Sequence, residues 1–245
     1  MAAEALGLTP ASLKADRSWV TEMDHAVQDH ILRAIAERFK GHGAVGEEDQ
    51  PDVPGLAPVT EAEYVWIIDP IDGTRNYVRS FPVFSTTIAV LHRGEPVAAA
   101  TFDPLTDRLY SAIRGGGAFL DGKRLSVADG VEDVDRLIGV PSERRVTPPE
   151  AVQRWSESAI LRCTGSTALH IAMVAAGCLD AAYGLDTKIW DIAAGALLVT
   201  EAGGVVTDVT GRPIFPFDAT TNARDPVPFL AAGTKLHAEL LQAFV

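Results

Sequence analysis

The most informative stretch of the chain reads Trp66-Ile67-Ile68-Asp69-Pro70-Ile71-Asp72-Gly73-Thr74. Apolar residues over 65–68 predict a short buried strand, and two aspartates follow it, three residues apart. Two carboxylates that are crowded in a partly buried place repel each other and lose hydration. A divalent hard cation relieves both costs, because it prefers carboxylate and carbonyl oxygens as ligands. The stretch therefore predicts a metal site at Asp69 and Asp72, with the Ile71 carbonyl available as a further ligand.

The end of the same stretch predicts an anion site beside the metal. Gly73 permits a close approach of the backbone, and a short helix can begin at Thr74. The free N–H groups at the start of a helix bind phosphate oxygens. A plainer interpretation also exists for this segment alone, in which Asp69 and Asp72 are helix-capping or turn aspartates.

Further acidic residues can each be interpreted in two ways. Glu47 and Glu48 follow the first predicted helix, and such a pair in a loop is usually solvated. Asp191 lies where another helix begins, which is typical of a helix N-cap. Asp24 lies three residues after Thr21, and the two resemble a capping box with aspartate in place of glutamate. Each of them could instead belong to the same site as the aspartates of the central motif.

The composition bounds the class of protein. The chain has 245 residues, 47% of them hydrophobic, which is ample for one large domain or two intimate subdomains. The net charge of −12 argues against a nucleic-acid polymer as partner, because such binding needs a basic surface. No secretory signal and no apolar run of about 20 residues is visible, which excludes a membrane span. We expect a cytoplasmic protein.

The two cysteines are consistent with that location. Cys163 and Cys178 form neither a CxxC pair nor a zinc-binding pattern, and we expect both to be ordinary buried thiols. A chain of this length with so few cysteines fits a reducing compartment.

Periodicity predicts the order of the main elements. Helices are expected over 21–39, 166–176, 192–202 and 236–244. Strands are expected over 85–91, 97–102, 109–112, 205–209 and 229–232, with a hairpin over 118–125. Turn residues between neighbouring strands of the first half predict antiparallel pairing. The polar segment 129–150 is expected to connect two subdomains, since strands and helices interleave only after it.

Several motifs together resemble the inositol monophosphatase family, a magnesium-dependent and lithium-sensitive branch of the sugar phosphatases. The resemblance extends from about Lys14 to the C-terminus. The matching stretches, in the order in which they occur in the family, are Val20–Asp24, Gly46–Glu48, Trp66–Thr74, Gly165–Ala168, Trp190–Gly195 and Glu201–Asp208.

The resemblance implies a fold and an assembly. The expected architecture is an α+β and α/β layered sandwich, the sugar-phosphatase fold, with alternating α/β/α/β/α layers. Residues 1–128 would form an N-terminal α+β subdomain with an antiparallel sheet. Residues 129–245 would form a C-terminal α/β subdomain that supplies Asp191 and the substrate contacts. The site would lie between them, and the protein would be a homodimer.

The resemblance also implies the metal ligands. A first magnesium ion would be held by Glu47, Asp69 and the carbonyl of Ile71. A second would be held by Asp69, Asp72 and Asp191, and a third, weaker ion would again use Glu47. The catalytic set is then Asp24, Glu47, Asp72 and Thr74.

The remaining roles follow from the same resemblance. Asp24 and Thr74 would orient a water that a metal ion activates, and the N–H groups of Gly73 and Thr74 would bind the phosphate. The residues expected to face the alcohol portion of the substrate are Gly165, Ser166, Thr167 and Asp191. The implied activity is that of a phosphoric monoester hydrolase, which cleaves a small phosphorylated substrate.

The substrate is less determined than the reaction. Inositol monophosphate or a related sugar or polyol phosphate is the first expectation. Gly184 stands where many inositol-cleaving relatives carry a glutamate, so we expect broad specificity and a sharper polyol preference in Gly184→Glu. The run 75–79 resembles the histidinol-phosphatase branch. Histidinol phosphate, fructose 1,6-bisphosphate and a 3′-phosphoadenosine nucleotide are the alternatives, and a catalytically idle metal-binding module is the rival outside the enzymes.

Overall fold

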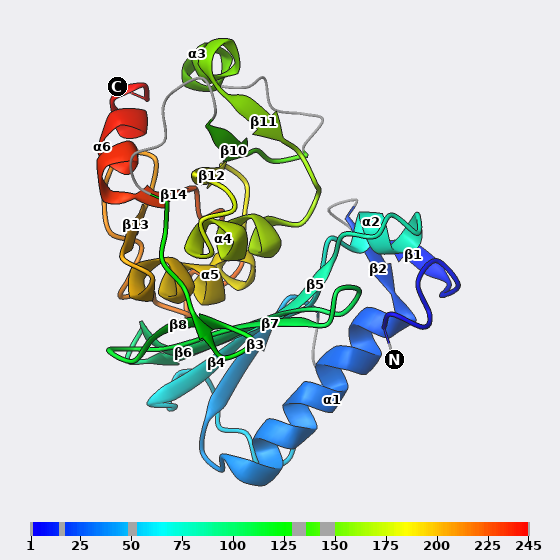
Figure 1. Ribbon diagram of the computed structural model, residues 1–245. Coiled ribbons are helices and arrows are strands. Elements are labelled where there is room, and N and C mark those ends of the chain that lie inside the picture. Colours follow the sequence, from blue (N-terminus) through cyan, green and yellow to red (C-terminus); the bar gives the residue numbers. More distant parts are fainter. Residues whose placement is uncertain (1, 15–17, 49–52, 129–135, 143–149, 245) are drawn as a thin grey trace.

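The computed structural model describes residues 2–14, 18–48, 53–128, 136–142 and 150–244. Within these residues, two sheets alternate with helices in layers (Figure 1). The layers are, in order, α1 (Glu22–Arg38), an N-terminal sheet, α4 (Thr167–Ala175) with α5 (Ile189–Glu201), a C-terminal sheet, and α3 (Glu150–Ser158) with α6 (Thr234–Gln242). The layered sandwich and its α/β/α/β/α order are therefore confirmed.

The N-terminal sheet follows the order of the sequence. Its strands are β3 (Gly43–Gly46), β4 (Tyr64–Asp72), β5 (Ser85–His92), β6 (Glu95–Asp103), β7 (Arg108–Ile113), β8 (Gly117–Leu120) and β9 (Lys123–Arg124). Strand β3 pairs in parallel with β4, and each later neighbour is antiparallel. The predicted hairpins are confirmed, whereas the strand expected over 65–68 is longer and continues through Asp72.

Helix α1 covers the outer face of this sheet. Its apolar side chains Leu32 and Ile35 pack against Ile68 of β4. At its start, the Thr21 side chain accepts the backbone N–H of Asp24, and the Asp24 carboxylate accepts the backbone N–H of Thr21. The predicted helix and its capping box are both confirmed.

A hairpin precedes α1 in a segment where the sequence shows little pattern. Strands β1 (Ala11–Leu13) and β2 (Trp19–Thr21) pair antiparallel, and β2 lies beside α2 (Thr74–Val78) (Figure 1). Helix α2 begins at Thr74 as predicted, and Gly73 is its N-cap with a φ of 96°. The hairpin thus brings the N-terminal part of the chain to the end of β4.

The C-terminal sheet has a mixed topology. Its order is β11 (Ile160–Arg162), β10 (Leu137–Gly139), β12 (Ala181–Gly184), β14 (Phe229–Gly233) and β13 (Gly204–Thr207). The first three strands are parallel, and β14 is antiparallel to both of its neighbours. The sequence predicted β13 and β14 but not β10, β11, β12 or α3, and much of the expected connection over 129–150 lies outside the described residues.

One apolar core joins the two sheets. Ile171 of α4 and Ile192 of α5 are completely buried, in the same cluster as Ile67 and Leu91 of the N-terminal sheet. The division of the chain at residue 128 stays a prediction. Among the described residues, no helix is long and apolar enough to span a membrane.

The expectation that the two cysteines are buried is wrong, because both are exposed. Cys163 directly follows β11, which is an edge strand, and Cys178 lies in the turn after α4. Neither position is covered by another layer.

Candidate active site

Strand β4 places the two aspartates of the central motif. Residues three apart in a regular strand point to opposite faces of the sheet. The register with β5 shifts between Asp69 and Asp72, which marks a β-bulge at Pro70 and Ile71. The bulge allows both carboxylates to reach the same side of the sheet, toward α4 and α5.

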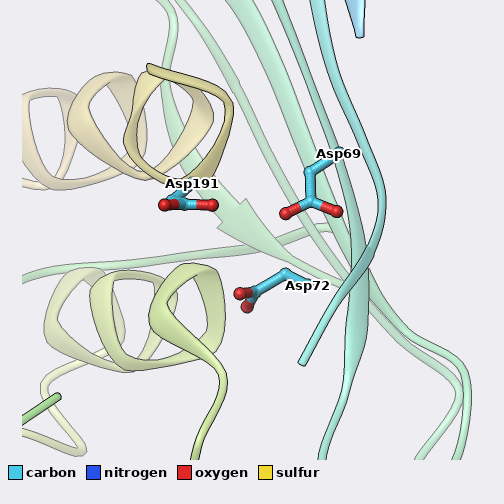
Figure 2. A group of neighbouring side chains, drawn as sticks. All are labelled: Asp69, Asp72 and Asp191. Carbon is cyan, nitrogen blue, oxygen red and sulfur yellow. The ribbon is translucent and has the colours of Figure 1, made fainter. Parts of the chain in front are cut away.

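A third carboxylate comes from the first turn of α5. The carboxylate oxygens of Asp69, Asp72 and Asp191 lie within 4.8 Å of one another. Figure 2 shows the three groups pointing toward a common space between β4 and α5. Asp191 is not the N-cap, since Lys188 occupies that position and donates its N–H to Asp191 Oδ2 over 2.7 Å. The tertiary fold therefore assembles the cluster from two distant segments.

Burial and mutual repulsion oppose the ionisation of this cluster. Burial raises the pKa of Asp69 well above its usual range, and the charges of Glu47, Asp72 and Asp191 raise it further. Burial, and after it the charge of Asp72, also raise the pKa of Asp191 well above its usual range. Burial raises the pKa of Asp72 to about 6, although hydrogen bonds from the start of α4 lower it. A bound divalent cation would favour the ionised form of all three carboxylates.

One oxygen of the cluster lacks a protein partner. Asp69 is only 1% exposed, and its Oδ1 atom accepts no hydrogen bond from the described part of the chain. A buried carboxylate oxygen without a partner is costly, and a ligand is one explanation for it. The donor set consists of oxygens alone, as Mg²⁺ and Ca²⁺ require. The described residues therefore fit a hard divalent cation.

Asp72 also binds the start of α4. Ser166, the N-cap of that helix, donates its hydroxyl to the Asp72 carboxylate. The backbone N–H groups of Thr167 and Ala168 donate to the same carboxylate over 3.2 and 2.9 Å. Two residues that were expected to face the alcohol portion of a substrate, Ser166 and Thr167, thus orient an expected metal ligand.

Asp24 and Thr74 are in contact although they lie 50 residues apart in the sequence. Thr74 Oγ1 lies 3.2 Å from Asp24 Oδ1 and 3.0 Å from the carbonyl oxygen of Ile71. Asp24 is fully buried, and burial raises its pKa. Asp24 also completes the capping box with Thr21, so that interpretation is confirmed, whereas its role in orienting a water stays a prediction.

Lys14 is a charged residue of the site that the sequence analysis missed. Its Nζ atom lies 2.8 Å from Glu47 Oε1 and 2.6 Å from Glu48 Oε1. Burial alone lowers the pKa of Lys14, but the two glutamates outweigh it and the pKa is raised. Glu48 is only 3% exposed, so the solvated interpretation of this acidic pair is wrong. The hairpin that positions Lys14 leaves no periodic signal in the sequence.

Glu47 takes a different position from the other expected metal ligands. It is not among the three residues whose carboxylate oxygens form the compact group, and its Oε1 faces Lys14. Its charge nevertheless acts on Asp69 strongly enough to raise that pKa. Glu47 therefore lies at the edge of the cluster, and its role as a ligand stays a prediction.

A cavity of about 500 Å³ opens beside these groups. Four of the expected site residues line it, namely Glu47, Gly73, Thr74 and Gly165. Its wall also includes Arg75 and the aromatic side chains of Trp19 and Phe81. A cavity of this size accommodates a small molecule.

Gly184 has no space for a side chain. A Cβ atom there would lie 2.6 Å from Thr187 Cγ2 and 2.7 Å from Phe229 Cε1. Phe229 is 1% exposed and cannot move aside without disturbing the core. The Gly184→Glu substitution considered from the sequence is therefore sterically excluded. Nearby, Asp186 forms an ion pair with Lys188, whose Nζ lies 3.8 Å from Asp186 Oδ1.

Comparison with known proteins decides the family. The sequence model of the inositol monophosphatase family matches residues 5–244 of this chain. The chain belongs to the inositol monophosphatase family.

Relatives of known name support this membership. An inositol-1-monophosphatase of Mesorhizobium japonicum is 36% identical over 82% of this chain and 76% of its own length. The Nus factor SuhB of Escherichia coli strain K12 is 34% identical over 95% of this chain and 88% of its own length. Among solved structures, a dual-specific IMPase/NADP phosphatase bound with D-inositol-1-phosphate is 25% identical, with a TM-score of 0.82 over 98% of this chain and 88% of its own.

Membership decides the reaction class. This inositol monophosphatase family member is a phosphoric monoester hydrolase of a metal-dependent family, with a buried acidic cluster at Asp69, Asp72 and Asp191. The interpretation of these aspartates as turn or capping residues alone does not account for the unpartnered Oδ1 of Asp69.

Proposed function

We propose that this protein hydrolyses inositol monophosphate and related sugar or polyol phosphates in the presence of Mg²⁺. The observation that carries the proposal is the buried group of Asp69, Asp72 and Asp191, whose carboxylate oxygens lie within 4.8 Å of one another. A cavity of about 500 Å³ beside Gly73 and Thr74 provides the space for the substrate.

The chain's oxygens would hold two or three Mg²⁺ ions. Asp69, Asp72 and Asp191 would share one ion, and Glu47, Asp69 and the carbonyl of Ile71 would hold another, with Glu47 also reaching a third. The ions would supply positive charge to the phosphate and the leaving oxygen and would lower the pKa of the attacking water. Inhibition by lithium belongs to the same proposal.

Thr74 and Asp24 would orient the attacking water. The Thr74 hydroxyl can accept a proton from that water while donating its own to Asp24 Oδ1, 3.2 Å away. Asp24 can take the proton because burial raises its pKa. The attack then needs no covalent phospho-enzyme, since phosphoryl transfer depends chiefly on positioning and charge neutralisation.

The substrate would lie across the cavity. Gly73 and Thr74 would contact the phosphate through their backbone N–H groups. The alcohol portion would lie toward Gly165 and Asp191. Ser166 and Thr167 would act chiefly through Asp72, whose carboxylate they bind.

Specificity should be broad, because Gly184 offers no side chain to bind a hydroxyl group. The test is a phosphate-release assay on inositol 1-phosphate, glycerol 2-phosphate, a hexose phosphate and histidinol phosphate, each with Mg²⁺ and with EDTA. With Mg²⁺ we expect values of kcat/KM within about tenfold of one another, and in EDTA we expect no phosphate release. A preference of about a thousandfold for one substrate would contradict broad specificity. Phosphate release that is equal in EDTA would contradict the whole proposal.

A second class of substrate is favoured by Arg75, a cationic residue in the lining of the same cavity. A second phosphate group would find a bidentate partner there. Fructose 1,6-bisphosphate and a 3′-phosphoadenosine nucleotide therefore belong in the same panel. Lower kcat/KM for both in Arg75→Gln, with inositol 1-phosphate unaffected, would support this class.

The assembly and location complete the proposal. A homodimer rests on the family resemblance, and a cytoplasmic location rests on the low cysteine content. The absence of a nucleic-acid partner rests on the net charge of −12. A gel-shift experiment with RNA tests the last point, since one relative is called a Nus factor.

A further inference from the structure

Two backbone loops that line the cavity approach each other closely. Gly73 has a φ of 96°, and Gly165, which also lines the cavity, has a φ of 88°. A Cβ atom on Gly73 would lie 3.2 Å from the carbonyl oxygen of Gly165. The turn that precedes α2 and the loop that precedes α4 therefore meet backbone to backbone, and small shifts of either would change the space between them.

Asn76 ties these two loops together. Its Nδ2 atom donates to the carbonyl oxygen of Thr164 and to that of Val83, each over 2.7 Å. Asn76 belongs to α2, which begins directly after Gly73, whereas Thr164 belongs to the loop before α4. A single side-chain amide thus links α2 to the loop that precedes α4, and both segments line the cavity.

His170 holds the other side of Thr164. The backbone N–H of Thr164 lies 3.4 Å from His170 Nε2, and the Thr164 hydroxyl lies 2.7 Å from the same atom. Burial lowers the pKa of His170 to about 4, so the ring is neutral at physiological pH. Since a backbone N–H can only donate, Nε2 is the accepting nitrogen and the hydroxyl donates to it as well.

We propose that Asn76 and His170 are positioning residues that hold Thr164 between them and thereby determine how strictly the cavity discriminates among leaving alcohols. The proposal rests on the phosphatase function proposed above. Neither residue needs to touch the substrate, because both act through the loop at 164–165. The next turn is held separately, since Asp72 binds Ser166, Thr167 and Ala168. Loosening Thr164 should therefore change the alcohol side of the cavity and leave the carboxylate cluster in place.

A matched pair of variants tests the role of the Thr164 hydroxyl. Thr164→Val keeps the shape and removes the hydroxyl's hydrogen bond to His170 but leaves the backbone N–H contact, whereas Thr164→Ser keeps the hydroxyl. The measured quantity is the ratio of kcat/KM for inositol 1-phosphate to kcat/KM for methyl phosphate, which has almost no alcohol portion. We expect Thr164→Val to lower this ratio about fivefold, chiefly through KM for inositol 1-phosphate, and Thr164→Ser to keep it within about twofold.

Asn76→Asp tests the other contact. The two side chains have the same shape, but a carboxylate cannot donate to the carbonyl oxygens of Val83 and Thr164. We expect a similar fall in the ratio, and a double variant with Thr164→Val that is little worse than either single one, because both act on the same loop.

Two results would overturn the inference. One is a ratio that stays within about twofold of the wild type in both Thr164→Val and Asn76→Asp. The other is an equal loss of kcat for both substrates together with a lower Tm, which is the result of a merely structural role.

Amide hydrogen exchange separates this inference from the proposed function. We expect faster exchange over residues 163–166 in Asn76→Asp and Thr164→Val but not in Thr164→Ser, whether or not the protein turns over a substrate. Unchanged exchange in both variants would overturn the inference. A wild-type protein that hydrolyses none of the substrates, while exchange responds as expected, would instead reject the proposed function.

Discussion

Ser166 donates its hydroxyl to the carboxylate of Asp72, a partner 94 residues away in the sequence. Asp72 ends a strand of the N-terminal sheet, and Ser166 caps the helix that lies between the two sheets. The same carboxylate is one of the three that form the acidic cluster. The Asp72 side chain therefore joins the two halves of the chain and takes part in the candidate metal site. Its substitution should affect both catalysis and the packing of the two halves against each other.

Asp72→Asn should abolish most of the activity. The substitution keeps the shape but removes a charge and turns one acceptor into a donor that faces the N–H groups of α4. A fall in kcat of about a hundredfold or more in saturating Mg²⁺ is expected for the loss of a central electrostatic group. Ser166→Ala is the matched control, in which kcat should fall only about tenfold because the Asp72 carboxylate remains. Near-normal turnover in Asp72→Asn would reject its assignment as a metal ligand.

Asp69→Asn should make the metal-free protein more stable and the enzyme inactive. The wild-type carboxylate is buried with an unpartnered Oδ1, so removing its charge relieves repulsion within the cluster. We expect the free energy of unfolding in EDTA to rise by about 1 kcal/mol or more. Asp180→Asn is the control, because buried Asp180 accepts the N–H of Leu137 over 2.7 Å and should lose stability. A less stable Asp69→Asn protein in urea unfolding would contradict this account.

Thr74→Ala should lower kcat with little effect on folding. Thr74 is not the N-cap of α2, since Gly73 holds that position, so the loss of its hydroxyl removes no cap. A fall in kcat of about a hundredfold is expected if the hydroxyl orients the water, and Thr74→Ser should recover most of it. Measuring kcat and Tm on the same preparations distinguishes a catalytic role of the hydroxyl from a structural one. A lower Tm with kcat retained would show that the hydroxyl is structural.

Lys14→Met should make the protein depend more strongly on Mg²⁺ for stability. Without the ammonium group, Glu47 and Glu48 lose the cation that contacts both of their carboxylates. We expect the metal-free variant to lose about 1 to 3 kcal/mol of stability, and added Mg²⁺ to restore part of it. The measurement is the rise in Tm on adding Mg²⁺, with Lys14→Arg as the control that keeps the charge. An equal rise in all three proteins would show that Lys14 does not neutralise the site.

His170 should make the protein sensitive to mild acid. Its pKa in the folded protein is lowered by burial from 6.5 to about 4, so the unfolded chain binds a proton first as the pH falls. The stability that it contributes is complete above the unfolded pKa and is lost as the pH falls toward the folded one. Between about pH 7 and about pH 4.5, we expect the wild type to lose about 2 to 3 kcal/mol more than His170→Gln in urea unfolding. Equal losses would contradict a neutral, buried His170.

The elements that the sequence predicted well are those whose signals are local. The helix expected over 21–39 is observed as Glu22–Arg38, because its apolar period and its cap lie within the helix itself. The hairpins between 85 and 125 followed from alternating side chains and turn residues. Strand β3 was missed because Gly43–Gly46 is short and has no pattern of its own, and it exists only through its parallel pairing with β4.

The candidate site shows the same division. The motif from Asp69 to Thr74 could be selected from the sequence, since crowded carboxylates after a buried strand already favour a cation. Asp191 was selected only through the resemblance to the family. The bulge that turns Asp69 and Asp72 to one side, and the exposure of Cys163, could not, because both depend on which strand lies alongside.

The sequence by itself determined which residue types are available for the site, and its motifs indicated the reaction class through their resemblance to the family, because short contiguous motifs can be recognised without the fold. Tertiary structure alone decided which charges face each other. It placed Lys14 against Glu47 and Glu48, joined Asp72 to α4, and filled the space beside Gly184 with Phe229. These relationships arise from packing between segments far apart in the chain, and electrostatic and steric energies depend on distances of a few ångströms that no local pattern encodes.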